Sequence, residues 1–445
     1  MIAPVVVLLW LLVSCSGGEG PAAVIGPEEP RQGEVVLYRL SSGGEPAWAV
    51  EPPGAGLISA DGRFVGYQPG QAAIVARTPE GELRRAITIA PRSAPQGTFV
   101  VVRRGVETGR FTSDLWLSGN FGYTGTWLGS TVAGRLPGDR LFVWDLADPL
   151  APRLAMELPV DARTINTVNI RVDSAVAALT HEGSADGFNG VTLLSLADPL
   201  RPAVITRFTE GLEAGVHNVW LEGDFLYAAA DGAGNGLRII DIADPAHPAT
   251  AAAFAAETSF LHDVIVRNGL AFLSHWDAGL IILDVGNGIA GGSPFAPVEV
   301  SRILTEGGQT HNAWYWPDSG YVFVGEEDFE APGRLHVVDV RDLRSPREVA
   351  TFAVSGETPH DFWLDEERGI LYAAWYTAGL RAIDVTGELL GELEKQGREI
   401  AALRYGSDAG CLSADGTCAM APQLHQGLIF VADLNTGLWV FEPRF

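Results

Sequence analysis

The chain has 445 residues, and its acidic residues outnumber its basic ones by 55 to 30, which gives a formal net charge of −25. Such a chain would be repelled by a nucleic-acid backbone, and charge alone would not hold it on an anionic membrane surface. We therefore expect a solvated, soluble exterior and no nucleic-acid partner, in a chain long enough for one large domain and one small one.

Residues 1–15, MIAPVVVLLWLLVSC, form an apolar run that is too short to span a bilayer. The run ends in Leu-Val-Ser-Cys and resembles a bacterial lipoprotein signal, in which Cys15 would be lipidated and become the new N-terminus. No lysine or arginine precedes the run, so a plain secretory signal is the alternative. Residues 16–30 have the Gly, Pro and Glu content of a flexible tether. The resemblance implies an extracytoplasmic protein held to the membrane only through its lipid.

Residues 31–92 read as short strands separated by turns, which predicts a small all-β sandwich. The run WAVEPPGAGLISADGRFVGYQPGQAAIVAR resembles the bacterial Ig-like group 2 domain. That resemblance implies a spacer or adhesive module, and this segment contains no catalytic constellation.

From residue 98 onward one unit recurs, most clearly at 217–248 and again from His262, His311 and His360. Each copy holds short runs of β-branched and aromatic residues bounded by Gly, Asp, Asn and Pro. Four antiparallel strands per unit predict the blade of a β-propeller, whose blades must stack to bury their faces.

The amino-acid sequence of the repeat indicates a family. The stretches LRIIDIADP, LFVWDLADP, LIILDV, LHVVDV and LRAIDV resemble the LVIVD repeat of bacterial surface or periplasmic propellers, over roughly residues 98–445. The resemblance implies a fold and a location outside the cytoplasm, but it implies no activity, because the biochemical role of that family is not settled.

The register position of His217 recurs seven times, which predicts seven blades; it is held by Ser113, Asn166, His217, His262, His311, His360 and Met420. The last unit stops before a fourth strand, and TFVVVRR at 98–104 has no blade of its own. We expect this segment to supply the missing strand and remove the open edges. The predicted fold is an all-β, monomeric chain with a seven-bladed propeller after a small Ig-like sandwich.

Four histidines in one register should gather at one mouth of the propeller channel. The loops after the second strands share that face and carry Asp231, His275, Asp277, Glu326, Glu327, Asp328, Trp375 and Asp433. Converging imidazoles and carboxylates suit zinc, copper or iron, and a thioether from Met420 would favour copper. The candidate ligands are His217, His262, His311, His360 and Met420, with His275, Asp277, Glu326 and Asp231 behind them. Binding should weaken below a pH of roughly 6.5, where imidazole protonates.

A structural role for the same histidines is the alternative. Each histidine would hydrogen-bond the backbone of the next blade and so lock the ring. Ser113 and Asn166, in the same register, are better suited to such hydrogen bonds than to metal ligation. We interpret the tryptophans of the innermost strands, such as Trp220, Trp314 and Trp363, as packing between blades.

Two cysteines close together, Cys411 and Cys418, should pair as a disulfide in an exported chain. The sequence holds no GxSxG, P-loop, CxxC or HExxH motif. The function it favours is a binding or scaffold protein for a protein or glycan ligand. The alternative is an extracytoplasmic metalloenzyme with its metal at the histidines, and fold alone decides neither.

Overall fold

The computed structural model describes residues 22–93, 96–105, 109–128, 134–173, 175–232, 236–256 and 260–445. The chain divides into two compact units, Met1–Pro91 and Arg92–Phe445. The predicted signal and Cys15 lie outside the described residues. Within those residues the helical structure is the short 3-10 helix η1 (Leu393–Gln396), and no helix has the length and apolar character needed to cross a bilayer.

The first unit contains small antiparallel sheets around one apolar core. One sheet runs β2(Val35–Leu37)-β6(Arg63–Gly66)-β5(Gly56–Ile58), and another runs β4(Ala47–Glu51)-β7(Gly70–Thr78)-β8(Gly81–Ile89). Alternate residues of these strands point inward and bury Phe64, Ile74 and Ile87 around the ring of Tyr38.

The predicted tether is too long by several residues. Val24–Ile25 forms β1 and pairs with β3(Arg39–Leu40), and Val24 is buried in the core of the first unit. An apolar side chain that covers this core gains more from burial than it would in a solvated tether, so the folded unit begins before residue 31.

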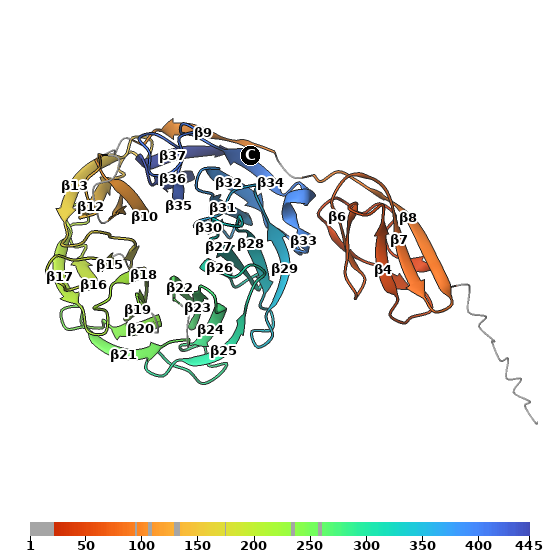
Figure 1. The fold of residues 1–445 in the computed structure, drawn as a ribbon, viewed down its shortest axis with the longest axis horizontal. Coiled ribbons are helices and arrows are strands. Elements are labelled where there is room, and N and C mark those ends of the chain that lie inside the picture. The colour runs from red at the N-terminus through yellow and green to blue at the C-terminus, as the bar shows by residue number, and fades with distance from the viewer. Residues whose placement is uncertain are drawn as a thin grey trace, which may run out of the picture. The chain divides into compact units, whose positions relative to one another are not determined.

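The described residues of the second unit form seven sheets, which Figure 1 shows around a common centre and which are antiparallel apart from the added strand β33. The first four are β10(Phe111–Ser118)-β11(Phe121–Trp127)-β12(Arg140–Asp145)-β13(Arg153–Pro159), β14(Val168–Ile170)-β15(Val176–His181)-β16(Gly190–Ser195)-β17(Ala203–Phe208), β18(Val216–Glu222)-β19(Phe225–Ala230)-β20(Gly236–Asp241)-β21(Ala249–Phe254), and β22(Asp263–Arg267)-β23(Leu270–His275)-β24(Gly279–Asp284)-β25(Val298–Ile303). The other three are β26(Thr310–Trp316)-β27(Tyr321–Glu326)-β28(Leu335–Asp339)-β29(Arg347–Phe352), extended by β33(Gly391–Glu392), then β30(Phe362–Asp365)-β31(Ile370–Ala374)-β32(Leu380–Asp384)-β34(Glu399–Leu403), and β35(Ala419–His425)-β36(Leu428–Asp433)-β37(Gly437–Arg444)-β9(Thr98–Arg103).

Burial within each sheet follows from this arrangement. The second and third strands are covered on both faces, and every residue of β23, β24 and β27 is buried. Strands covered on both faces favour continuous apolar runs, and these are the runs that the repeat displays. The fourth strands, such as β13 and β17, lie on the outer rim in Figure 1 and are largely exposed or half-buried.

The two ends of the second unit pair with each other. Strand β9 lies antiparallel to β37, with Phe99 opposite Pro443, so the predicted pairing of this segment with the C-terminal unit is confirmed. The same sheet is joined to the first through the Gln423 amide, whose oxygen accepts from the Leu117 N–H at 2.8 Å and whose nitrogen donates to the Leu117 carbonyl at 3.1 Å.

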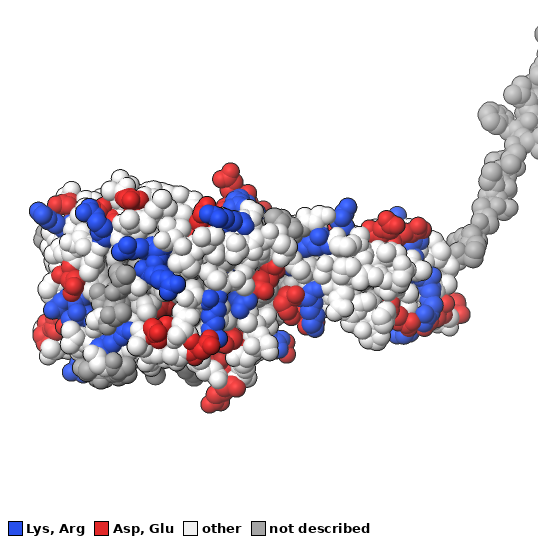
Figure 2. Space-filling model, turned by 90° about the horizontal axis from the view of Figure 1, so that it is seen from above, with Lys and Arg blue, Asp and Glu red and all other residues white. Residues whose placement is uncertain are grey.

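The predicted disulfide between Cys411 and Cys418 is present and closes a small loop between β34 and β35. On the face drawn in Figure 2, acidic and basic side chains are interspersed rather than gathered by sign. The acid excess is therefore spread over that surface, as expected for a solvated exterior.

Replacement of Phe99 by alanine should destabilise the second unit more than replacement of its neighbour Val101. Phe99 is 3% exposed and packs against the rings of Tyr372 and Phe441, whereas Val101 is 36% exposed on the same strand. Loss of the buried ring should cost about 3–5 kcal/mol, and loss of the exposed side chain about 1 kcal/mol or less. Urea unfolding measures both, and similar costs for the two variants would contradict a closing role for β9.

Candidate functional site

Irregularities at the start of the innermost strands turn one register position toward the channel. His217, His311 and Met420 each lie in a β-bulge, where one residue is left without a partner on the second strand. His262 directly precedes β22 and His360 lies two residues before β30, and their N–H groups donate to the carbonyls of Ser274 and Ala374 at 2.9 Å. A bulge re-aims a side chain, which explains why these residues face the channel while their neighbours face the sheets.

The four predicted histidines form one continuous row of rings at the channel mouth. Ring centroids are 4.2 Å apart between His217 and His262, 4.0 Å between His262 and His311, and 4.4 Å between His311 and His360. Imidazoles at this spacing come from four successive sheets, so the row follows the curvature of the channel. The prediction that they converge on one face is confirmed by these contacts.

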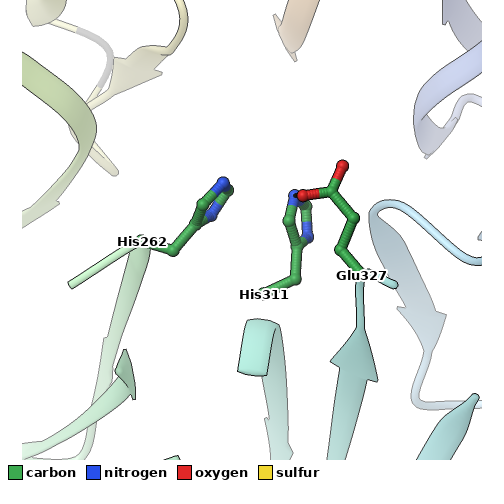
Figure 3. A group of neighbouring side chains, drawn as sticks. All are labelled: His262, His311 and Glu327. Atoms are coloured by element: carbon green, nitrogen blue, oxygen red, sulfur yellow. Dashed lines mark ion pairs between the residues drawn. The ribbon is translucent and has the colours of Figure 1, made fainter. Parts of the chain in front are cut away.

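Glu327 joins this row from the loop after β27, and Figure 3 shows its carboxylate beside His311. Single ligand atoms from His262, His311 and Glu327 all lie within 4.8 Å of one another. The side chain of Glu327 is held by the Tyr376 hydroxyl, which donates to its other oxygen. Two imidazoles and an oriented carboxylate therefore face one point.

The imidazole of His311 is the most enclosed group in the row. It is 2% exposed, and neither of its ring nitrogens has a hydrogen-bond partner among the described residues. The nearest carboxylate oxygens are those of Glu327 at 3.7 Å from Nε2 and Asp361 at 3.9 Å from Nδ1, both too far for a hydrogen bond. Burial lowers the pKa of His311 to about 4 despite these carboxylates, so the ring is neutral at physiological pH.

His217 belongs to a second cluster at the same mouth. Its Nδ1 lies 3.2 Å from a carboxylate oxygen of Glu182, and Asp231 completes a group whose ligand atoms are all within 4.8 Å of one another. Burial, and then the charge of Glu182, raises the pKa of Asp231 to about 7. Burial opposes the charged form of His217, but the hydrogen bond and charge of Glu182 outweigh it and raise the pKa of His217.

Carboxyl groups line the channel just below the histidines. Asp114, Asp263 and Asp361 each follow the mouth position by one residue and line the same narrow pocket of about 90 Å³. Burial, and then the charge of Asp361, raises the pKa of Asp263 to about 7 and that of Asp114 well above its usual value. Asp361 itself stays ionised, because the positive charge of His360 overcomes burial and lowers its pKa.

Tryptophans close the channel below these acids. The ring centroid of Trp116 lies 5.5 Å from that of Trp220 and 6.0 Å from that of Trp363. The ring centroids of Trp314 and Trp363 are 4.9 Å apart. Trp116 comes from the first sheet, and neither Trp220 nor Trp363 comes from a neighbouring sheet. Trp314 and Trp363 come from adjacent sheets, and Trp220 and Trp314 pack against the clusters between neighbouring sheets, so the interpretation of these three residues as packing between blades is confirmed. The contacts of Trp116 are of a different kind. The rings meet across the axis and separate the histidine pocket from a second pocket on the other side.

Not all of the residues predicted to lie behind the metal ligands reach the channel mouth. Whether one does depends on the face of the second strand from which its side chain projects. Asp231 lies at the mouth, but Glu326 accepts from His336 and the Arg334 N–H, away from the histidines. His275 is buried within its sheet and Asp277 is exposed. The side chain that reaches the mouth stands one residue after the strand, because successive side chains point to opposite faces. In that position are Glu182, Asp231, Trp276 and Glu327, whereas Tyr376 stands two residues after β31.

Met420 occupies the register position predicted for it, but its side chain serves another purpose. It packs in an apolar cluster with Phe111, Cys418 and Leu434, and its carbonyl accepts from His360 Nδ1 at 2.8 Å. This packing gives no support to a thioether ligand, which was the reason for favouring copper. The backbone bond of His360 is of the kind that the structural alternative predicts.

The two remaining positions of the ring hold polar side chains that bond neighbouring sheets. The Ser113 hydroxyl donates to the Ile165 carbonyl at 2.6 Å, and the Asn166 amide donates to the His217 carbonyl at 3.1 Å. The locking role is thus seen at Ser113, Asn166 and His360, while neither nitrogen of His311 takes part in it.

The stability of the metal-free protein should fall as pH rises from about 6.5 to about 9. Burial opposes the charge on His360, but Asp361 outweighs it and raises the pKa of His360 to about 9. A histidine whose pKa is raised on folding contributes fully below its unfolded value of about 6.5, and that contribution is lost as pH passes the folded value. The variant Asp361→Asn should show a smaller loss over this range in urea unfolding.

An exposed pair provides the control for this experiment. His247 and Asp244 are 2.9 Å apart, with side chains that are 83% and 65% exposed. Asp244→Asn should leave the pH dependence as in the parent protein, because solvent screens this pair. A slope unchanged in Asp361→Asn would contradict the assignment of the pH dependence to His360.

Comparison with known proteins agrees with the repeat. The LVIVD repeat model matches residues 215–255 and 261–305, which are the units that begin at His217 and His262. No curated protein sequence matches this chain significantly. Among solved structures, the computationally designed protein Ika8 is similar, with 11% sequence identity, a TM-score of 0.51, and coverage of 78% of this chain and 100% of that one. The chain thus carries LVIVD repeats, which are typical of β-propeller proteins, within an all-β fold of four-stranded sheets.

Proposed function

We propose that the second unit binds a divalent transition metal at the channel mouth through His262, His311 and Glu327. The observation that carries this proposal is the buried imidazole of His311, whose two nitrogens have no hydrogen-bond partner among the described residues. Burying polar nitrogens without partners is costly, and a metal ion would satisfy one of them.

The ligand set favours zinc or iron over copper. Two imidazoles and one carboxylate are the donors of many catalytic zinc sites and of non-haem iron sites, and both types leave positions open to a substrate. His262 and His311 have pKa values lowered by burial, while Glu327 stays ionised, so all three are in the form that ligates. Since both imidazoles resist protonation, binding should persist below the pH of 6.5 expected from the sequence.

The residues around the site fit a reactive centre as well as a binding site. A metal held there would act as a Lewis acid on water or on a small molecule. Tyr376 orients Glu327 through its hydroxyl, and the tryptophan layer shuts off solvent from below. Asp263, with its raised pKa, offers a carboxyl that can exchange a proton near neutral pH. We therefore infer a metalloenzyme rather than a scaffold for protein or glycan ligands.

The same proposal includes the architecture around the site. We infer that the seven sheets are the blades of a seven-bladed propeller, because each contributes an innermost strand to one channel. The first unit is proposed to be an Ig-like spacer, in keeping with the small sheets that its described residues form around a buried core. Cys15 is proposed to carry lipid that tethers the protein outside the cytoplasm.

Alanine at His262 or His311 should abolish stoichiometric metal. Elemental analysis after incubation with zinc or ferrous iron should find one ion per parent chain, and the variants should bind about 100-fold more weakly or worse, beyond the loss typical of outer residues. The stability of His311→Ala without metal should change little, because neither ring nitrogen of His311 has a hydrogen-bond partner among the described residues. Thermal unfolding with and without chelator measures this.

Two other histidines make matched controls. His247 is exposed, and its replacement by alanine should affect neither metal nor stability. His181 is buried away from the mouth with Nε2 2.6 Å from the Thr192 hydroxyl, so His181→Ala should lower stability by about 1–3 kcal/mol and leave the metal in place. If His311→Ala behaves like His181→Ala and the parent holds no ion, the metal proposal is wrong and the binding-protein interpretation stands.

Cys15→Ser should release the protein from the membrane fraction of a bacterial host. The parent should incorporate labelled palmitate, since stable anchoring needs more than one acyl chain and lipoprotein cysteines carry several. Unchanged fractionation of the serine variant would show that Cys15 carries no anchor.

A further inference from the structure

A third pocket, distinct from the one below the tryptophan layer, opens beside the histidine row. It has a volume of about 480 Å³, which lies in the range of small-molecule sites. Its walls come from the loop after β27, the loop before β30, the loop after β31 and the disulfide loop. We call it the side pocket, and its apolar lining residues are Trp127, Phe329, Pro332, Leu412, Met420 and Leu434.

The side pocket adjoins the proposed metal site through residues that belong to both. Met420 lines the side pocket and the histidine pocket alike. Tyr376 lines the side pocket, and its ring lies 5.0 Å from that of His360. Glu327 also lines it, while its second oxygen is 3.7 Å from His311 Nε2. A molecule in the side pocket would therefore end next to the proposed metal ligands.

The charged residues that line the side pocket are acidic. Glu327, Asp328 and Glu357 line it, and no lysine or arginine is found among its described lining residues. No cation is paired with Asp328 or Glu357 in the described structure; Asp328 accepts backbone N–H groups of its own loop, and Glu357 accepts from the Thr377 hydroxyl. Such a rim would repel a carboxylate or phosphate ligand and attract a cation.

Its aromatic residues point to the same class of ligand. Phe329 is 72% exposed at the rim, and its ring lies 5.3 Å from that of Tyr376. Both rings line the side pocket, so a ligand there would meet aromatic faces. Aromatic faces beside carboxylates recognise organic ammonium groups, through attraction of the cation to the ring and to the acids together.

We infer that the side pocket binds a small organic amine with an apolar body, and that this amine is the ligand presented to the proposed metal centre. The second half of this inference rests on the proposed function, whereas the first half does not. The apolar body would lie against Phe329 and Leu412, and the ammonium group would lie among Glu327, Asp328 and Glu357.

Calorimetry with three matched probes tests the pocket. The probes are 2-phenylethylamine, its neutral counterpart 2-phenylethanol and the anion 3-phenylpropionate, each titrated into the full chain freed of metal by chelation. The amine should bind about tenfold more tightly than the alcohol, because the cation gains attraction to both rings and acids, and the anion should not bind measurably. Equal affinity for amine and anion would overturn the inference.

Variants locate the binding. Phe329→Ala should weaken binding of the amine by about tenfold, and Glu357→Gln by a similar factor. Phe188→Ala, which removes a ring that is 60% exposed in the loop between β15 and β16, should have no effect. Phe329 is exposed, so its variant will fold. Amine binding that is unchanged in both Phe329→Ala and Glu357→Gln would place the ligand elsewhere and overturn the inference.

The variant His311→Ala separates this inference from the metal proposal. It should bind 2-phenylethylamine as the parent does, because His311 does not line the side pocket. With ferrous iron bound to the parent, the ring protons of the amine should relax faster in NMR, and His311→Ala should lose that effect. Amine binding in a protein that holds no metal would remove the proposed function and leave the amine site; fast relaxation that persists in His311→Ala would overturn the placement beside the metal.

Discussion

A four-stranded sheet with two apolar faces is not stable alone, because both faces would be exposed to water. The rest of this structure follows from that constraint. The sheets of the second unit bury their faces against one another, as the clusters that mix residues of neighbouring sheets show. Repetition of one unit around a centre brings the same register position of every unit to the same place. A residue type that recurs in that position therefore becomes a cluster, although its members are far apart in the chain.

Because the titratable groups at the channel mouth lie close together, they take different protonation states. Imidazoles in contact cannot all carry a proton, because like charges at this distance repel strongly in a buried setting. The row resolves this by pairing its outer members with carboxylates, His217 with Glu182 and His360 with Asp361, while His262 and His311 remain neutral. The neutral pair is the one that Glu327 faces, so the proposed ligands are selected by their neighbours as well as by their positions.

The repeat predicted the register, the row of histidines and the pairing of the chain ends, because each depends on a pattern that recurs. The direction of side chains in individual loops was harder to predict from the sequence. Glu326 and Glu327 are adjacent in the sequence, and only the end of β27 decides that the second faces the mouth while the first turns to His336. Trp116, Trp220 and Trp363 belong to sheets that are not neighbours in the chain, so their meeting across the axis depends on the channel's width, which no spacing in the sequence encodes. The apolar packing of Met420 likewise depends on the disulfide loop.

The pairing of β9 with β37 also constrains how the chain can fold. Strand β9 precedes every other described strand of the second unit, yet its partner β37 follows all of them. Among the described strands this is therefore the pairing of greatest sequence separation, and its loop-closure cost is met only once β37 has been synthesised. Until then β9 is an apolar strand with two open edges, so chaperones or a delayed start of folding would protect it from aggregation. A chain held unfolded until β37 has been made avoids this exposure, because β9 then finds its partner as soon as folding begins.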